Sequence, residues 1–433
     1  MKNSVRRFAG FSYSLEGGLE RAGRPVKLGP QARQLLELLL DAKGEIVPKD
    51  EIASKLWPGQ EVSDDSIDRC AYLLRKPLKA VGLPELVATA YGRGLYLRAE
   101  IEESGDERPK AITVADSKAL ELWQTAYELA GRRTREGYSR AQEAIAAAAQ
   151  VQPDNGAVLA LSAELYAGQA MRGYVSPVAA ARLIEEQAGR ALELSPGFAP
   201  ALAVLGWARA VLVHGSEEIG IALIERSLAS NAWYSKSCTY RSWALAGRDR
   251  LGEAVADAEA CLRHNPMDQG LLSLHAWLVL LSGDRTEAAE RSRRGLAQRP
   301  DAAMLWLVLS ICASIDGDHD VAIDHARRGL DCVGEDPFAF SVLVYALACA
   351  GRRDEAAAAL ARADAVDGAE IPLTFRAAAV LALGRTDDAR EQLQRASRLK
   401  CPHFGFARYD ERLAPLRSDI LKFAGSARKQ AAE

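Results

Sequence analysis

A regular spacing of small residues marks the second half of this chain of 433 residues. One series of glycines recurs at intervals of 36, 34, 34 and 33 residues: Gly247, Gly283, Gly317, Gly351 and Gly384. A series of alanines recurs at intervals of 34, 34, 34 and 33 residues: Ala254, Ala288, Ala322, Ala356 and Ala389. A fixed period of this length is typical of stacked helical repeats, because one short unit cannot bury its apolar face alone. The sequence therefore predicts an α-solenoid in this region.

Each small residue has a local role in such a unit. Glycine fits the tight turn between two helices, and alanine lets the second helix approach the first closely. Proline ends the second helix, and Pro266 and Pro300 are again 34 residues apart, with Pro153 and Pro196 in earlier units. A unit of 34 residues with two helices resembles the tetratricopeptide repeat. We expect about eight such pairs over residues 116–402, followed by a C-terminal capping segment, residues 403–433.

The first hundred residues have a different character. They hold 16 Lys and Arg against 13 Asp and Glu, whereas the remainder of the chain is acidic. Short alternating apolar patterns predict antiparallel strands, and helices are expected over residues 30–44, over 49–56 and from about residue 63. A small α+β domain over residues 1–100 would then precede a charged linker, residues 101–115. A basic module at one end of an acidic chain indicates contact with nucleic acid there.

The third expected helix carries a clear apolar stripe. Ile67, Ala71, Leu74 and Leu78 recur at helical spacing and predict the face that packs on the core. Two strand-like segments follow the helix and predict a hairpin with Arg93 at its tip. Pro77 removes one helical hydrogen bond, so a kink or an early end is expected near it.

Two segments of this module resemble the signatures of a known family. Residues 66–78 read SIDRCAYLLRKPL and residues 89–97 read TAYGRGLYL. Both are similar to the OmpR-type winged-helix DNA-binding domain. The resemblance implies that the third helix enters the major groove of double-stranded promoter DNA and that the hairpin, or wing, reaches the adjacent minor groove. It also implies two tandem half-sites, and we consider a homodimer. The expected DNA-contacting residues are Ser66, Arg69, Cys70, Tyr72, Leu73, Arg75, Lys76, Thr89, Tyr91 and Arg93.

Two of these positions depart from the family pattern. The family often has His where this chain has Cys70, and Arg where it has Leu73. An arginine there could bond to guanine, whereas Leu73 offers only apolar contact to a thymine methyl group. An alternative hypothesis is therefore an interaction adaptor or scaffold whose winged helix no longer reads DNA specifically. The two hypotheses differ in whether DNA binding survives competitor DNA.

The order of the two modules resembles bacterial one-component transcription regulators, in which the repeats receive the signal. Repeat geometry predicts a concave groove that would take a protein, a peptide or a small apolar ligand. The alternative is that the same side chains pack only against neighbouring repeats. The residues expected to line the groove are Thr239, Trp243, Ser273, Trp277, Leu307, Ile311, Ser341 and Tyr345.

Other chemistry is not expected. No catalytic grouping is apparent, so the chain is not expected to be an enzyme and no cofactor is expected. Residues 316–327 resemble a calcium loop, but Arg327 stands where the twelfth-position Glu would be, so no metal site is expected. Seven widely spaced cysteines without a C-x-x-C pattern argue against a disulfide framework and for a reducing compartment. No apolar run is long enough for a membrane span and no signal peptide is recognised, which favours a cytoplasmic protein without membrane association.

Overall fold

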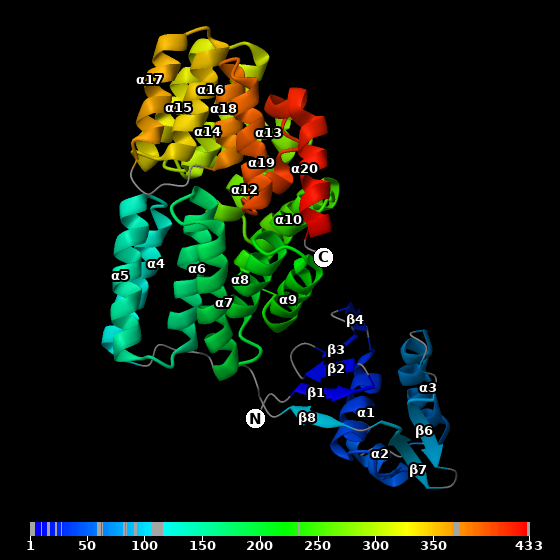
Figure 1. Ribbon diagram of the computed structural model, residues 1–433. Helices are drawn as coiled ribbons and strands as arrows, with labels where there is room; N and C mark the ends of the chain where they lie inside the picture. The colour runs from blue at the N-terminus through cyan, green and yellow to red at the C-terminus, as the bar shows by residue number, and fades with distance from the viewer. Residues whose placement is uncertain are drawn as a thin grey trace. The chain divides into compact units, whose positions relative to one another are not determined.

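The structure is a computed structural model in which the chain forms two compact units, residues 1–110 and 111–433 (Figure 1). The expected fold class is confirmed, since a small α+β unit precedes an array of helical repeats. The described residues are 5–9, 11–14, 18–21, 24–26, 28–58, 62, 64–80, 83, 85–90, 93–99, 101–104, 116–232, 234–366 and 372–430.

The first unit begins with a five-stranded antiparallel sheet in the order β4-β3-β2-β1-β8. Its register places Tyr13 opposite both Arg6 and Leu19, and Arg6 also opposite Glu103. Because β8 pairs with β1, the first residues of the expected linker belong to the sheet, and the expected boundary at residue 100 is wrong for them. Residues 105–115 lie outside the described residues. The strands are β1 (Val5–Phe8), β2 (Phe11–Ser14), β3 (Gly18–Arg21), β4 (Arg24–Val26) and β8 (Glu102–Ser104).

Three helices and a second, three-stranded sheet complete this unit. The helices are α1 (Pro30–Asp41), α2 (Lys49–Leu56) and α3 (Asp64–Ala80). The sheet has the order β5-β7-β6, with β5 (Val47–Pro48), β6 (Val87–Ala90) and β7 (Gly94–Leu97). Helix α3 continues past Pro77 to Ala80, so the expected early end is wrong. Leu74 and Leu78 are fully buried on either side of Pro77, and this packing holds the last turn although one backbone hydrogen bond is lost.

The second unit is a series of antiparallel helix pairs, α4–α5 through α18–α19, each packed on the next (Figure 1). The first eight helices are α4 (Ser117–Gly131), α5 (Arg135–Val151), α6 (Gly156–Arg172), α7 (Pro177–Leu194), α8 (Ala199–Val211), α9 (Glu217–Ser230), α10 (Ser235–Gly247) and α11 (Leu251–His264). The next eight are α12 (Gln269–Leu281), α13 (Arg285–Gln298), α14 (Ala303–Asp316), α15 (His319–Val333), α16 (Pro337–Cys349), α17 (Arg353–Asp364), α18 (Leu373–Ala382) and α19 (Thr386–Arg398). Two short 3-10 helices, η1 (Phe404–Phe406) and η2 (Glu411–Leu416), and α20 (Arg417–Gln430) follow.

The periodic small residues act as expected in most repeats. All five periodic alanines are fully buried, because each lies where a second helix crosses the first. Gly283, Gly317, Gly351 and Gly384 adopt the left-handed backbone conformation that glycine tolerates best. Gly247 does not, since it is the last residue of α10 and the left-handed residue is Asp249, with φ 69°. Arg133, two residues after Gly131, likewise has φ 57°.

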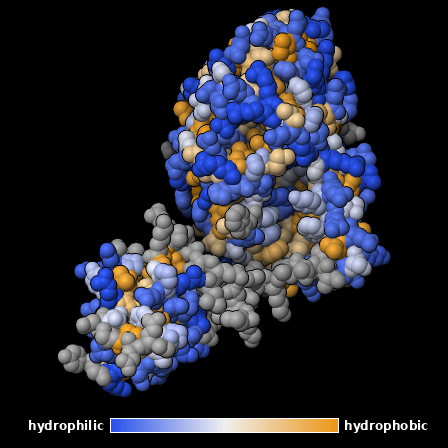
Figure 2. Space-filling view, turned by 180° about the vertical axis from the view of Figure 1, so that it is seen from behind, coloured by the Kyte–Doolittle hydropathy of each residue, from blue (hydrophilic) through white to orange (hydrophobic). Residues whose placement is uncertain are grey.

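The array curves so strongly that helices far apart in the sequence meet. The Tyr174 hydroxyl, just after α6, donates to the carboxylate of Asp336, which caps the start of α16. Arg172, the last residue of α6, lies 3.6 Å from the same carboxylate. The surface of the array seen in Figure 2 is mostly hydrophilic, with hydrophobic residues interspersed in small groups. No helix in the described ranges combines the length and apolarity that a membrane span requires.

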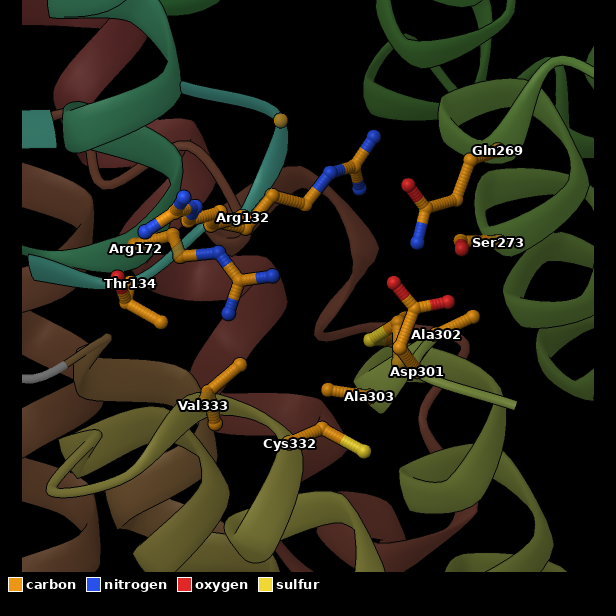
Figure 3. Close-up of a pocket in the computed structure, with 13 residues that line it drawn as sticks. Arg132, Thr134, Arg172, Gln269, Ser273, Asp301, Ala302, Ala303, Cys332 and Val333 are labelled. Carbon is orange, nitrogen blue, oxygen red and sulfur yellow. The ribbon is translucent and has the colours of Figure 1, made fainter. Parts of the chain in front are cut away.

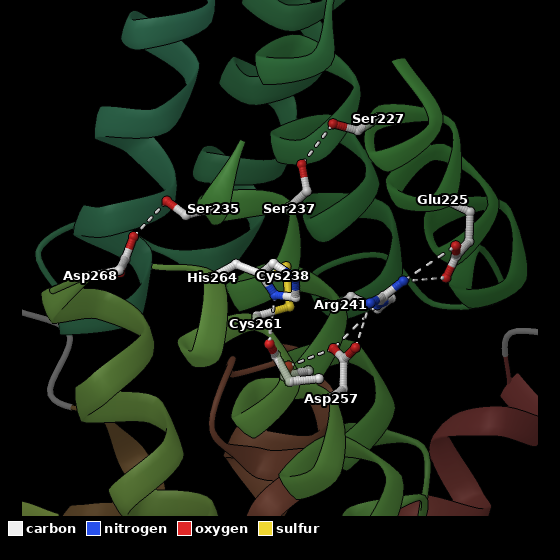
Figure 4. Close-up of a disulfide and its surroundings, with 12 residues drawn as sticks. Glu225, Ser227, Ser235, Ser237, Cys238, Arg241, Asp257, Cys261, His264 and Asp268 are labelled. Carbon is white, nitrogen blue, oxygen red and sulfur yellow. Dashed lines mark hydrogen bonds and ion pairs between the residues drawn. A yellow bond between two sulfur atoms is a disulfide. The ribbon is translucent and has the colours of Figure 1, made fainter. Parts of the chain in front are cut away.

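A disulfide joins the two helices of one repeat. Cys238 of α10 and Cys261 of α11 are bonded, with Cα atoms 6.3 Å apart (Figure 4). Close by, Arg241 pairs with both Asp257 and Glu225, which adds polar links between the same helices and α9. The expectation that the cysteines form no disulfide is wrong for this pair, because a helical hairpin brings residues 23 positions apart into contact.

Candidate nucleic-acid interface

The buried face of α3 fixes which residues can reach a ligand. Ile67, Cys70, Ala71, Leu74 and Leu78 each have an exposed fraction of 2% or less. Cys70 was expected to contact DNA, and this is wrong, because it stands one turn before Leu74 on the core side of the helix. Burial raises the pKa of the Cys70 thiol to about 11, so this side chain stays protonated and unreactive.

The opposite face of α3 is exposed and cationic. Arg69, Tyr72, Leu73 and Lys76 recur every three or four residues, so they lie on one side of the helix. The exposed fraction is 61% for Tyr72 and 44% for Leu73. Among the described residues, no carboxylate pairs with Arg69 or Lys76. Ser66, at the beginning of the same helix, is half-buried. This face presents together an aromatic ring, an aliphatic side chain and two cations that have no ion-pair partner among the described residues.

Arg75 was expected to contact DNA, but it ties the helix to the wing. Its Nε donates to the carbonyl of Val87 at 2.8 Å, and its Nη2 donates to the hydroxyl of Thr89 at 2.7 Å. Both partners belong to β6, so the guanidinium fixes the hairpin against α3. Arg75 and Thr89 are therefore residues that position the interface. At the other end of the helix, the ammonium of Lys49 lies 2.7 Å from Asp64 and links α2 to the start of α3.

The wing is the hairpin of β6 and β7. Ala90 pairs with Gly94, and the N–H of Arg93 donates to the Ala90 carbonyl at 2.9 Å, which places Arg93 exposed at the turn. Gly94 has φ 152°, and a Cβ there would collide with the carbonyl of Val47. Only glycine therefore lets β7 pair closely with β5. Tyr91, also expected at the interface, lies outside the described residues.

The concave face of the repeats is covered by the chain itself. We call residues 400–416 the C-terminal strap. The indole N–H of Trp243 donates to the strap carbonyl of Pro402 at 3.2 Å, and its ring lies 5.2 Å from that of His403 and 5.0 Å from that of Phe406. Trp277 and Tyr345 each lie 5.5 Å from the guanidinium of Arg412. These three groove residues thus contact the strap, and the groove is not an open surface.

The other expected groove residues are placed differently. Leu307 and Ile311 are buried between helices, and the hydroxyl of Ser341 donates to the Pro337 carbonyl of its own helix at 2.8 Å. Thr239 is half-buried. Ser273 lines a cavity deeper in the array. The strap residues were not among the expected groove residues, because their aromatic and charged side chains carry no periodic signal in the sequence.

The N-terminal unit is similar to a known protein family. The model of the family "Transcriptional regulatory protein, C terminal" matches residues 23–97. The transcriptional regulator HilA of Salmonella typhimurium strain LT2 is 34% identical over 106 residues, which cover 24% of this chain and 19% of HilA. The chain thus spans about a fifth of the length of this curated relative.

Several solved structures share the helical-repeat fold with part of this chain. A structure of the APC/C hetero-tetramer Cut9-Hcn1 has a TM-score of 0.49 and 14% identity, and covers 69% of this chain and 55% of that one. A TPR protein of Thermus thermophilus has a TM-score of 0.36 and 17% identity. The match covers 49% of this chain and 99% of the Thermus protein. The repeat assignment rests on the 34-residue period and the helix pairs of this chain itself. The chain therefore carries an OmpR-type winged-helix domain of the transcriptional regulatory protein family at residues 23–97, followed by tetratricopeptide-like repeats.

Proposed function

We propose that this chain is a bacterial one-component transcription regulator that works in the cytoplasm, where promoter DNA is reached. It binds double-stranded DNA through α3 and the wing, and it receives its signal through the repeats. The observation that carries the proposal is the exposed face of α3, where Arg69 and Lys76 stand unpaired among the described residues, opposite the buried stripe.

The interface residues divide by the DNA group that they suit. An arginine can donate two hydrogen bonds to a guanine edge, so Arg69 is assigned base readout in the major groove. Tyr72 and Leu73 suit apolar contact with thymine methyl groups. Lys76 suits the phosphate backbone as a point charge, and Arg93 at the wing tip suits a narrow minor groove. Arg75 and Thr89 hold these two contact regions at a fixed separation.

The test is enrichment of genomic DNA fragments by the purified full-length protein at about 150 mM salt with excess non-specific competitor. We expect a few promoter fragments, with tandem half-sites, to be enriched. Arg69→Ala should weaken binding to these sites by roughly 5- to 150-fold, since a bidentate base contact is worth about 1–3 kcal/mol. Arg140→Ala in α5 removes an equal charge from an exposed helix of the repeats and serves as the control. Equal enrichment by the Arg69→Ala protein would exclude the assigned readout helix.

A second candidate function is the interaction adaptor, and the exposed Tyr72 and Leu73 favour it. Two neighbouring hydrophobic side chains on one exposed helix face are also what a protein partner binds. This hypothesis predicts DNA binding that competitor DNA abolishes, with no fragment enriched. The enrichment experiment therefore separates the two functions.

Regulation through the repeats involves a protein, peptide or small ligand. A partner that uses Trp243, Trp277 or Tyr345 has to displace the strap, because these side chains already contact it. The proposed input is therefore competitive with the strap at the concave face. A homodimer formed on tandem half-sites is part of the same proposal and is checked by the stoichiometry of the DNA complex.

A further inference from the structure

A cavity of about 230 Å³ lies inside the curved repeat array (Figure 3). Its walls come from the α4–α5 turn, the end of α6, the start of α12, the α13–α14 turn and the end of α15. The cavity therefore exists only when repeats far apart in the sequence are assembled. In Figure 3, Arg132, Thr134 and Arg172 lie on one side, facing Gln269 and Ser273 on the other.

The cationic side of the cavity is formed by Arg132, Arg133 and Arg172. Arg172 is compensated by Asp336 at 3.6 Å, and Asp301, which also lines the wall, is held by Arg299 at 3.1 Å. Within the described part of the chain, no acidic side chain forms an ion pair with Arg132 or Arg133. Among the described residues, the two cavity arginines thus form no ion pair with a carboxylate, and the charges of Asp268 and Asp301 offset that of Arg133 only at longer range.

Arg133 is the more unusual of these two arginines. Its guanidinium reaches the start of α12, where a Cβ on Gly270 would lie 3.2 Å from Nη2. Burial is the main reason why the pKa of Arg133 is lowered, and nearby Arg172 lowers it further, while Tyr138 and Asp268 oppose the shift. An anion that enters the cavity would therefore stabilise the charged form of the Arg133 guanidinium.

The backbone at Arg133 gives an internal comparison. The turn between paired helices is left-handed at Gly283, Gly317, Gly351 and Gly384, but at Arg133 and Asp249 a charged residue holds this costly conformation. Asp249 uses its position to bind the strap, with the Tyr409 hydroxyl at 2.5 Å and the Arg408 guanidinium at 3.5 Å. Arg133 stands at the equivalent turn with the opposite charge and faces the cavity.

Neutral donors complete the site. Ser273 is buried at the cavity wall and Gln269 is half-buried beside it. The Thr134 oxygen accepts from the N–H of Gly137 at 3.0 Å as a helix cap, which leaves its hydroxyl hydrogen able to donate. Arginines with hydroxyl and amide donors are the set that recognises carboxylate and phosphate oxygens.

We propose that this cavity binds a small organic or inorganic oxyanion, of the carboxylate or phosphate class, held by Arg132 and Arg133 with Thr134, Gln269 and Ser273. The volume of about 230 Å³ far exceeds the roughly 10–15 Å³ that one water molecule needs, so the cavity has room for a small ligand. Because the walls come from distant repeats, the ligand would bridge them. The proposal for this cavity does not rest on DNA binding by α3.

The probes are inorganic phosphate and succinate, titrated calorimetrically into the full-length protein at constant ionic strength set by sodium chloride. We expect saturable one-to-one binding of at least one probe. Binding of phosphate alone, or of succinate alone, identifies the class. Arg133→Gln should weaken binding at least tenfold, because it removes a charge-assisted hydrogen-bonding group. Arg182→Gln, on the exposed surface of α7, is the matched control and should bind normally.

A second variant keeps the test independent of folding. Arg133→Gly relieves the left-handed conformation, so it should leave the melting temperature unchanged or higher while weakening binding as strongly as Arg133→Gln. Binding that survives both substitutions, or an absence of saturable binding for both probes, would overturn the proposal. If added chloride displaces both phosphate and succinate, the cavity holds an adventitious ion only, and the proposed oxyanion specificity is wrong.

Discussion

At the residue scale, His403 makes the strap sensitive to acid. Its ring lies among Trp243, Phe338 and Phe375, and its Nε2–H donates to the Met171 carbonyl at 2.8 Å, since a carbonyl oxygen can only accept. Burial lowers its pKa from 6.5 to about 4. The neutral ring is therefore the form that packs in the folded array.

We expect the folded state to lose stability as the pH falls from about 6.5 toward 4. Over this interval the unfolded chain binds a proton at His403 that the folded chain refuses, and buried His275, whose pKa is also lowered to about 4, acts in the same direction. The measurement is the urea midpoint at pH 7 and pH 5 for the native protein and for His403→Phe. The urea midpoint of His403→Phe should depend less on pH than that of the native protein. The midpoint of His264→Gln, which alters an exposed histidine, should depend on pH as strongly as that of the native protein. An identical dependence in all three proteins would contradict the role of His403.

Arg412 gives a second prediction at this scale. Its side chain is fully buried, stacks over Phe375 at 4.7 Å and pairs with buried Asp410 at 2.7 Å. Arg412→Ala should lower the free energy of unfolding by about 3–5 kcal/mol, because it leaves a buried carboxylate unpaired. Arg250→Ala, which breaks an exposed pair with Glu253, should lower the free energy of unfolding far less, because solvent screens that pair. Chemical denaturation of both variants measures the difference, and similar losses would refute the assignment.

At the element scale, α3 and the wing separate two roles that the sequence could not distinguish. Arg75→Ala should lower both stability, by about 1–3 kcal/mol, and DNA affinity, because two hydrogen bonds to β6 are lost. Lys76→Ala should lower DNA affinity alone and reduce the salt dependence of binding by about one phosphate contact. Thermal melts together with binding curves at several salt concentrations test this pair. Equal stability of the Arg75→Ala and native proteins would argue against the positioning role.

The disulfide supplies a prediction for one helix pair. It closes a loop of sequence separation 23 between α10 and α11, which in the chain-entropy treatment is worth about 3 kcal/mol. Reduction of the native protein should lower its urea midpoint accordingly, while the double variant Cys238→Ala with Cys261→Ala should not respond to reductant. A native protein that is insensitive to reductant would show that the bond does not contribute to stability.

The elements themselves were largely predictable, because their signals are local. The 34-residue period gave the helix pairs, and the apolar stripe of α3 gave its buried side. Cys70 was misplaced because a small, weakly polar residue fits either edge of a helical stripe. Arg75 was misassigned because its partners come from β6, and a strand pattern does not reveal which carbonyl a side chain reaches.

At the scale of the whole molecule, what the sequence did not reveal is how the array closes. The groove residues were expected to face a partner, but Trp243 meets Pro402, which is 159 positions away in the chain. The oxyanion cavity is likewise built from turns that lie up to about two hundred residues apart. Curvature is the sum of small rotations between repeats, and no single residue pattern encodes it.

The contact of Tyr174 with Asp336 has a consequence for how the array unfolds. An open stack of repeats resembles a zipper, in which each unit touches only its neighbours and the ends fray first. Here the second and seventh helix pairs are joined directly, and the strap adds the bond from His403 to Met171 across the same gap. Melting one end therefore breaks contacts with the middle. The array should therefore unfold as a single cooperative unit rather than as a series of independent ones. A destabilising substitution in one turn should then lower the stability of every repeat.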